Sequence, residues 1–577
     1  GGVLRARWVR AHRHAIHWHG GVLAQHAPGA VGVLSLVRME EALAALSSLI
    51  TGRKRSDGIN WEEDFRKFYS FLEKLEMQEA LRSMRVIHVA GTKGKGSTCA
   101  FAESILRTCG VKTGLFTSPH LVNVRERFRI NGKLVDEHVF LEQFWWCWNK
   151  LKEGDESNVQ MPPYFRFLTL LGFRIFQVEQ VEAVVLEVGL GGRLDATNVV
   201  PTPMVCGVAA LGMDHVEILG DTLYLIGREK AGIFKTGVPA LTVPQIPEGM
   251  KALCEVAEAK EVQLREVQPL AVSTIGHVPA HGQGLLEHIG IGGAHQLVNA
   301  GLAVELCRVW AQRCVSLGCM PRHLAGTFER CQKELAENKL PDEFARGLRD
   351  TRWAGRAQVI DDLPRNLFDG CHGRHHEQQT SVLENLAYFL DGAHTPESMQ
   401  ACAQWFCDVQ AEIYAGRPET VNDDTRNVLV FNCMEERDPS SLLGPLAKAV
   451  QESNIEFSAA YFVPNDSSRS SLSSAVSGPQ TTPAATLNLE KELPWQHRLQ
   501  TTWDALLKQR QRLKGVAPPD ASKSVHSESF LSNSLAGTLA VVHDSARRSP
   551  KTRVQVLVTG SLHLVGDVLR LLKRVPL

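Results

Sequence analysis

The sequence lacks several features that would place a 577-residue chain in a simple class. None of its 13 cysteines forms a C-x-x-C pair, the spacing typical of redox and zinc motifs. Scattered cysteines are typical of a reducing compartment rather than of a disulfide framework. No apolar run is long enough to span a bilayer, so no membrane span is expected. A chain of this length is expected to form two or three domains.

The sequence also lacks a net charge. Lys plus Arg and Asp plus Glu number 63 each, so the formal charge is zero. This balance argues against broad binding to nucleic acid or to an anionic membrane, although it allows a local basic pocket for an acidic substrate. A hydrophobic share of 44% with 22% charged residues is ordinary for a globular protein.

Acidic residues are absent before Glu40. The segment 1–38 carries Arg5, Arg7, Arg10 and Arg13 in its first 20 residues. This pattern resembles a mitochondrial presequence, although Ser35 is its only serine. Met39 then opens the helix-like stretch MEEALAALSSLI, so a start at Met39 is the alternative. We expect a leader at 1–38, with the protein in the mitochondrion when the leader is used and in the cytoplasm otherwise.

Strands alternate with helical stretches along the chain, which predicts βαβ units and mainly parallel sheets. The β-branched runs VEAVVLEVGLGG and PMVCGVAALG are typical of buried strands that end in glycine. We therefore predict an α/β fold with a phosphate-loop domain at 39–347 and a smaller Rossmann-like α/β domain at 348–577. Stretches rich in Ser, Thr and Pro predict disordered insertions near 465–490 and 515–535.

The stretch HVAGTKGKGSTCAF, at 88–101, indicates a phosphate site although it does not match G-x-x-x-x-G-K-[ST]. A strand runs into glycines and a helix is predicted from about Ser97, so backbone N–H groups and the helix dipole meet at one point. Lys95 would neutralise phosphate, and Ser97 or Thr98 could reach phosphate or metal. A glycine-rich turn with an exposed lysine is the simpler alternative.

Polar side chains follow three further predicted strands. Ser118 and His120 come after KTGLFT, Glu187 ends a second strand, and Asp214 and His215 follow a third. Ligands bind at the carboxyl ends of strands in doubly wound sheets, so these groups are expected to meet. A hard cation with few protein ligands and phosphate oxygens would be Mg²⁺. A salt-bridge role for the glutamate and a simple loop role for the histidine are the alternatives.

These motifs together resemble the folylpolyglutamate synthases of the Mur ligase superfamily, and the vertebrate-type enzymes in particular. The resemblance covers most of 39–577 and keeps the order of the family's motifs. The motifs are HVAGTKGKGST, TSPHLVNVRERFRING, MPPYFRFLTL, EVGLGGRLDATN, LGMDHVEILGDT, EKAGIFK, WAGRAQV, YFLDGAHTPESM and VLVTGSLHLVG. In this family the loop reads GT-x-GKGS, which accounts for the mismatch with the general pattern.

The resemblance implies roles for individual residues. Those implied to bind ATP are Gly91, Thr92, Gly94, Lys95, Gly96, Ser97, Thr98, Asn299, Arg356, Asp391 and His394. Those implied to hold metal are Ser118, Glu187, His215 and Lys230, the last corresponding to a lysine that is carbamylated in related enzymes. The implied catalytic residues are Lys95, Lys230, His215 and Arg356. The implied folate contacts are His120, Leu121, Arg125, Phe165 and Phe167.

The implied activity is an ATP-dependent ligation of L-glutamate to the γ-carboxylate of a reduced folate. The implied partners are these three small molecules and Mg²⁺ at two sites, with a monomeric protein; a monovalent cation at a second site is left unassigned. Three alternatives remain at this point: a sister ligase such as a dihydrofolate synthase, a non-ligase P-loop NTPase, and an inactive binding protein. Phosphate release without folate and glutamate would identify the NTPase, and absence of any ATP turnover would identify the binding protein.

Overall fold

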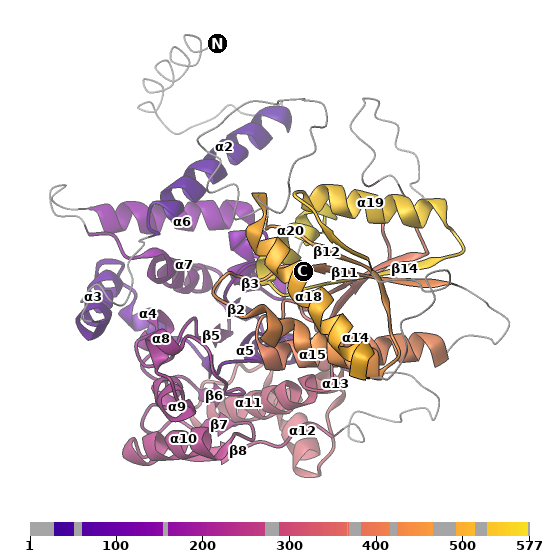
Figure 1. Cartoon of the computed structure of the whole chain (residues 1–577). Helices are drawn as coiled ribbons and strands as arrows, with labels where there is room; N and C mark the ends of the chain where they lie inside the picture. The colour runs from indigo at the N-terminus through magenta and orange to yellow at the C-terminus, as the bar shows by residue number, and fades with distance from the viewer. Residues whose placement is uncertain are drawn as a thin grey trace, which may run out of the picture.

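The computed structural model describes residues 28–50, 61–153, 160–271, 288–365, 367, 382–415, 424–465, 492–513 and 528–574. It has two α/β domains side by side, coloured indigo to magenta and orange to yellow in Figure 1. The segment 351–357 joins them. None of the described helices is long and apolar enough to cross a membrane.

The N-terminal domain is built on an eight-stranded sheet of order β4-β3-β2-β5-β1-β6-β7-β8. The strands β1, β2, β5, β6, β7 and β8 run parallel to one another, and β3 and β4 are added antiparallel at the β2 edge. The bounds are β1 Val86–Ala90, β2 Thr113–Phe116, β3 Phe128–Ile130, β4 Lys133–Leu134, β5 Ala183–Glu187, β6 Val205–Val208, β7 Ala240–Thr242 and β8 Leu264–Glu266.

Helices cover both faces of this sheet. They are α2 (Pro28–Ser47), α3 (Trp61–Lys74), α4 (Gln78–Ser83), α5 (Lys95–Thr108), α6 (Glu137–Lys152), α7 (Tyr164–Val178), α8 (Val216–Leu219), α9 (Leu223–Ala231), α10 (Pro247–Ala259), α11 (Gln296–Ser316), α12 (Ala325–Ala336) and α13 (Asp342–Asp350). Alternate residues of β5 explain the arrangement: Val185 packs with α5 and α11, whereas Val184 and Leu186 pack with α6 and α7. A strand buried on both faces reads as the continuous apolar run seen in the sequence.

The C-terminal domain has a six-stranded sheet of order β13-β12-β11-β14-β10-β9, parallel except for β9. Leu429 and Phe431 face α14, α15 and α18, and Val428 and Val430 face α19 and α20. The bounds are β9 Gln358–Ile360, β10 Leu386–Leu390, α14 Pro396–Ala415, β11 Thr425–Phe431, α15 Pro439–Glu452, β12 Phe457–Phe462, α18 Pro494–Leu513, β13 Glu528–Leu531, α19 Leu535–Arg548, β14 Arg553–Thr559 and α20 Leu562–Leu571.

The predicted α/β class with two mainly parallel sheets is confirmed. The predicted domain boundary at 347/348 falls inside α13, which packs on α5 and therefore belongs to the first domain up to Asp350. Helix α2 begins at Pro28, so residues 28–38 of the predicted leader continue into the helix that we expected to open at Met39. Residues 1–27 lie outside the described residues.

The predicted insertions fall mainly on 466–491 and 514–527, which also lie outside the described residues. The end of the second one is a correction. Residues 528–531 form β13, which pairs in parallel with β12, and 535 begins α19. Backbone pairing at the sheet edge orders ESFL although half of its residues are polar.

Candidate active site

A cavity of about 1060 Å³ lies between the two domains, at the carboxyl ends of β1, β2, β5 and β6. Both domains contribute side chains to its wall, as expected for a ligand site in an open α/β sheet. The predicted residues that line it are Thr92, Gly94, Lys95, Gly96, Ser97, Ser118, Leu121, Phe165, Glu187, His215, Asn299, Arg356, Asp391 and His394. The fold therefore gathers groups that are up to 302 positions apart, from Thr92 to His394, at one crevice.

The phosphate loop turns sharply from β1 into α5. Gly94 has φ of +79°, and a Cβ there would lie 2.1 Å from Asn299 Oδ1, so only glycine fits. The first N–H groups of α5, which begins at Lys95, have no intrahelical acceptor. Unpaired amides, the helix dipole and a lysine at one point form a phosphate site.

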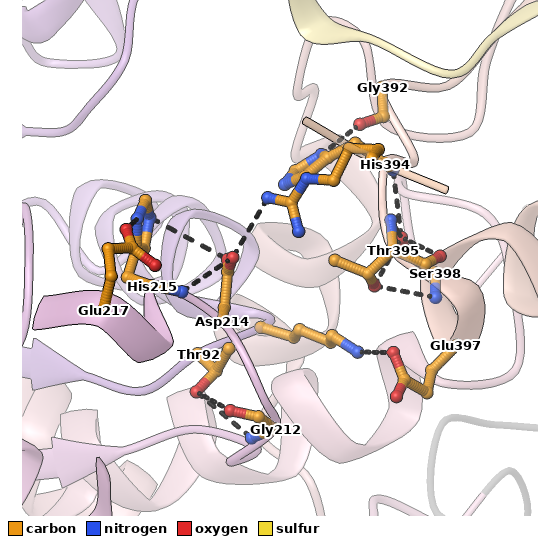
Figure 2. Close-up of polar contacts among 12 residues, drawn as sticks. Thr92, Gly212, Asp214, His215, Glu217, Gly392, His394, Thr395, Glu397 and Ser398 are labelled. Atoms are coloured by element: carbon orange, nitrogen blue, oxygen red, sulfur yellow. Dashed lines mark hydrogen bonds and ion pairs between the residues drawn. The ribbon is translucent and has the colours of Figure 1, made fainter. Parts of the chain in front are cut away.

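Neighbouring backbone fixes the loop in place. The Thr92 hydroxyl donates to the Gly212 carbonyl and accepts from the Gly212 N–H, both at 3.1 Å, so its polar groups hold the loop to the segment after β6 (Figure 2). Lys95 Nζ lies 3.3 Å from the Thr92 carbonyl oxygen. The Thr92 side chain therefore positions the loop, and the ammonium group of Lys95 faces the cavity.

Lys230 lies behind the phosphate loop rather than on the cavity wall. Its Nζ donates to the Gly91 carbonyl at 2.9 Å, and only 4% of the residue is exposed. Burial, together with the charge of Lys95, lowers the pKa of Lys230 to about 7. A buried lysine with such a pKa is partly neutral near pH 7, and a neutral amine is a nucleophile.

Two strand-end groups meet beside the loop. The Ser118 N–H donates to Glu187 Oε2 at 2.9 Å, which joins the segment after β2 to the end of β5. Burial raises the pKa of Glu187, against the attraction of Lys95. Among the described residues no cation lies within ion-pair distance of this carboxylate, so it is available to a bound metal ion.

His215 occupies a left-handed turn, with φ of +50°, just before α8. Its ring lies beside Glu217, with Nδ1 3.9 Å from Glu217 Oε1 and Nε2 3.9 Å from Asp214 Oδ2 (Figure 2). About half of its side chain is exposed. Asp214 also accepts a hydrogen bond from Arg437 of the other domain at 3.1 Å.

The donor set fits Mg²⁺ better than a transition metal. In the part of the chain that the structure describes, no group of three or more His, Cys, Asp or Glu side chains could hold a metal. Ser118, Glu187 and His215 nevertheless line the same cavity. Mg²⁺ is usually held by one or two carboxylates, with waters and substrate phosphates completing the shell. These residues therefore fit a cation that arrives with a nucleotide.

The C-terminal wall is held by Asp391. Its Oδ2 accepts from the Ala357 N–H at 2.8 Å and its Oδ1 from the Ala393 N–H at 2.9 Å. These bonds fasten the WAGR turn to the end of β10 and place Arg356 on the cavity wall. The predicted nucleotide contact at Asp391 is thus accompanied by a structural role that its sequence motif did not reveal.

Two further contacts cross or border the cleft. His394 Nδ1 lies 2.8 Å from the Gly392 carbonyl, so Nδ1 carries the proton and Nε2 is the free acceptor. Lys93 forms an ion pair with Glu397 of the opposite domain (Figure 2). With Asp214–Arg437, this pair connects the domains across the cavity.

Only part of the predicted folate wall is present. Leu121 and Phe165 line the cavity, but His120 does not. Its Nδ1 accepts a hydrogen bond from Arg127 Nε at 2.9 Å, and burial lowers the pKa of His120 to about 4. The neutral imidazole therefore orients Arg127, which itself lines the cavity.

The structure also corrects the prediction for Arg125 and Phe167. Arg125 points to α6, where its Nη2 lies 3.5 Å from Glu137 Oε2. Phe167 is fully buried in the aromatic core, with its ring centroid 5.1 Å from that of Phe144. Residues two positions apart on a helix lie on different faces, so α7 presents Phe165 to the cavity and Phe167 to the core.

Known proteins resemble this chain over nearly its whole length. A folylpolyglutamate synthase of Arabidopsis thaliana is 45% identical over 550 residues, which cover 93% of this chain and 88% of that protein. The chain belongs to the folylpolyglutamate synthase family. The mitochondrial folylpolyglutamate synthase of Homo sapiens is 37% identical, and the alignment covers 93% of this chain and 91% of the human protein. The resemblance to vertebrate-type enzymes is confirmed, and the plant enzyme is the more similar of the two.

Solved structures of folylpolyglutamate synthases share the fold. The Mycobacterium tuberculosis enzyme, solved with ADP and AMPPCP, superposes with a TM-score of 0.59 at 20% identity and covers 89% of this chain and 96% of its own. Escherichia coli FolC, solved with DHPP and ADP, gives a TM-score of 0.58 at 22% identity, covering 92% and 97%. No family model matches the sequence.

Sequence reasoning missed several residues of this cavity. Arg127, Tyr164 and Trp353 line the cavity although each stands within a motif quoted above. Their positions within these motifs could have indicated a role in the site, but no local sequence pattern distinguished them from core residues. The pairing of Lys93 with Glu397 left no signal at all, because it depends on how the domains dock.

Proposed function

We propose that the protein is an ATP-dependent ligase that adds L-glutamate to the γ-carboxylate of a reduced folate or folylpolyglutamate, as the names of its relatives indicate. The observation that carries this proposal is one cavity lined by a phosphate loop, by Glu187 and His215, and by Arg356 of the second domain. A site shared between two domains can bind three substrates and exclude water when it closes.

The chemistry begins with an unreactive carboxylate. An amine cannot displace oxide from a carboxylate, so the oxygen must first become a leaving group. The γ-carboxylate oxygen attacks the γ-phosphorus of ATP, which forms an acyl phosphate and releases ADP. The α-amine of glutamate then attacks the acyl carbon, loses a proton and expels phosphate. The products are one amide bond, ADP and inorganic phosphate.

The residues on the cavity wall suit the first step. Phosphoryl transfer needs positioning and neutralisation of charge more than covalent help from the protein. Lys95 and the free amides at the start of α5 would bind the β- and γ-phosphates, and Arg356 would approach from the second domain. Ser118, Glu187 and His215 would hold Mg²⁺, which supplies positive charge to the phosphate oxygens.

Lys230 is proposed to act from beneath the loop. Its amine is buried, with a lowered pKa, and bonds the Gly91 carbonyl. A neutral amine of this kind can add CO₂ and lose a proton to give a carbamate, as the lysine of related enzymes does. The resulting carboxylate would give the second metal position the oxygen ligand that the described residues otherwise lack there.

The folate is proposed to bind on the wall formed by Leu121, Tyr164 and Phe165. Arg127 lies in the same wall with a buried Nη1 that has no hydrogen-bond partner among the described residues. A guanidinium in this state suits a carboxylate of the substrate. We further propose that the protein works as a monomer and is found in the cytoplasm and the mitochondrion; the mitochondrial names of its mammalian relatives support the second location.

The experiment is a direct ligation assay. The protein is incubated with ATP, Mg²⁺, L-glutamate and tetrahydrofolate, and the products are resolved by mass. We expect folate products that are heavier by one or more glutamyl units, and none when ATP is replaced by a non-hydrolysable analogue. Phosphate release without a glutamyl product would favour a non-ligase ATPase and overturn the proposal.

A further inference from the structure

A second cavity, of about 220 Å³, adjoins the active site and is not used by the mechanism above. We call it the side cavity. It is formed mainly by α5, the β3–β4 hairpin and the start of the interdomain segment, with Leu115 of β2 and Asp350 of α13. Arg129 and Trp353 line both the side cavity and the main cavity. The residues of the side cavity are Ala100, Glu103, Ser104, Arg107, Leu115, Arg129, Asn131, Gly132, Lys133, Asp350, Thr351, Arg352 and Trp353.

The side cavity has an excess of positive charge. Four of its side chains are basic and two are acidic, so two positive charges are left over. Glu103 is already engaged: it accepts from Arg107 Nε at 3.1 Å and from the Thr113 hydroxyl at 2.5 Å. Asp350 lies 3.8 Å from Arg349, which is not part of the cavity. Glu103 and Glu126 attract Arg129 from a distance, but among the described residues no carboxylate forms an ion pair with Arg129, Lys133 or Arg352.

Arg129 is the buried member of this group. Only 6% of it is exposed, and its Nε has no hydrogen-bond partner among the described residues. Its guanidinium lies 4.9 Å from the centre of the Trp353 ring, a cation–π contact. Such a contact offsets only part of the cost of burying a charge that has no ion-pair partner.

Two more cations, Lys133 and Arg352, line the same cavity as this arginine. Lys133 is exposed at the tip of the hairpin and makes no ion pair with a described residue. Arg352 Nη1 donates hydrogen bonds to the carbonyls of Arg349 and Thr351, at 2.8 Å and 2.9 Å. Carbonyl bonds orient a guanidinium without cancelling its charge. A buried unpaired arginine with two such neighbours is the environment that binds an anion.

We propose that the side cavity binds a small multivalent anion through carboxylate or phosphate oxygens, with Arg129 at its base and Lys133 and Arg352 at its rim. Its volume lies below the range of about 300–1,000 Å³ typical of drug-sized ligands, so an intact nucleotide is too large. Inorganic phosphate and a γ-linked glutamyl peptide share the required chemistry.

An anion at this position would act on the nucleotide site through Trp353. A Cβ on Gly96 of the phosphate loop would lie 3.2 Å from the Trp353 indole nitrogen, so ring and loop are in close contact. An anion bound to Arg129 would hold the guanidinium in place, and with it the Trp353 ring that the guanidinium contacts. Ligand binding that orders a shared element raises affinity at the neighbouring site.

The first test is direct binding of inorganic phosphate, and in a second arm tri-γ-glutamate, to the full chain saturated with a non-hydrolysable ATP analogue. The analogue occupies the phosphate loop, and loss of the remaining anion binding in K133Q/R352Q distinguishes the side cavity from the wall around Arg127. We expect one anion per chain, and the arm that binds identifies the source. The double variant K133Q/R352Q should bind at least tenfold more weakly, and tenfold corresponds to about 1.4 kcal/mol.

The matched control is R82Q/K251Q, which removes the same charges from exposed positions, 67% and 70% exposed, outside both cavities. It should bind the anion as the wild type does. The proposal is overturned if the nucleotide-saturated wild type binds neither anion, or if the two double variants bind equally well. Either result would overturn the anion site without affecting the proposed ligase activity, because these variants alter no residue of the proposed mechanism.

Discussion

His88, on the strand that leads into the phosphate loop, should make the N-terminal domain sensitive to acid. Its Nε2 lies 2.9 Å from the Thr197 hydroxyl oxygen. That hydroxyl donates to Asp195 Oδ1 at 2.6 Å, so the oxygen can only accept from His88, and Nε2 carries the proton. Nδ1 is therefore the bare nitrogen, and it is buried without a hydrogen-bond partner in the described parts of the chain.

A proton on Nδ1 would create a buried charge with nothing to stabilise it. Burial, with a smaller contribution from Lys235, lowers the pKa of His88 to about 3. The unfolded chain protonates this residue near its ordinary pKa of about 6.5. Between these values the unfolded state binds more protons, so the stability is present above about pH 6.5 and is lost as the pH falls toward 3. At about pH 5 the loss is roughly 2 kcal/mol.

The assay compares urea unfolding of wild type and His88→Gln at about pH 7 and about pH 5, because other titrating groups are common to both proteins. The wild type should lose roughly 2 kcal/mol more than the variant between the two pH values. His323→Gln, at a side chain that is 62% exposed, should behave as the wild type. Equal losses in wild type and His88→Gln, or an NMR titration of His88 near pH 6.5, would refute the reasoning.

Three further predictions concern the active site. Lys230→Met should lower ligase turnover by about 100-fold or more, with little change in unfolding, because among the described residues the amine hydrogen-bonds only the Gly91 carbonyl. Gly189→Ala should raise KM for folate and leave KM for ATP unchanged, because the new Cβ would lie 2.4 Å from Phe165. Glu397→Gln should lower KM for ATP by about twofold to fivefold, because it frees the charge of Lys93 beside the phosphate loop.

Steady-state kinetics and urea unfolding measure all three, and each has a control. Lys235→Met removes another mostly buried lysine that bonds a backbone carbonyl, away from the loop, and should keep its turnover. Gly326→Ala has no atom within 4 Å of the new Cβ and should change neither KM. Normal turnover of Lys230→Met, an unaltered folate KM for Gly189→Ala, or an unaltered ATP KM for Glu397→Gln would each contradict its premise.

Local features of the site could be predicted from the sequence. A buried strand, a glycine turn and a helix start are encoded in adjacent residues, so the phosphate loop with Lys95 was within reach of pattern reasoning. Ser118, Glu187 and His215 were also accessible, because the carboxyl ends of parallel strands meet at one edge of the sheet. The structure places all three on the wall of the same cavity.

Features that depend on packing could not be predicted in this way. The direction of a side chain on α7 separates Phe165 from Phe167, and apolar composition alone does not set that direction. Lys93 and Glu397 are 304 positions apart, and their contact follows only from the docking of two domains. Short edge strands such as β13 gain order from a neighbouring strand rather than from their own residues.

The seven residues 351–357 between α13 and β9 have a consequence for how the domains meet. A tether this short keeps each domain at an effective concentration in the millimolar range relative to the other. The Lys93–Glu397 and Asp214–Arg437 pairs contribute only about 0–1 kcal/mol each. At this effective concentration such pairs form readily between the domains, and each also breaks readily. These two pairs therefore add little to the cost of separating the domains, to which the packing of Leu121 on the C-terminal core also contributes.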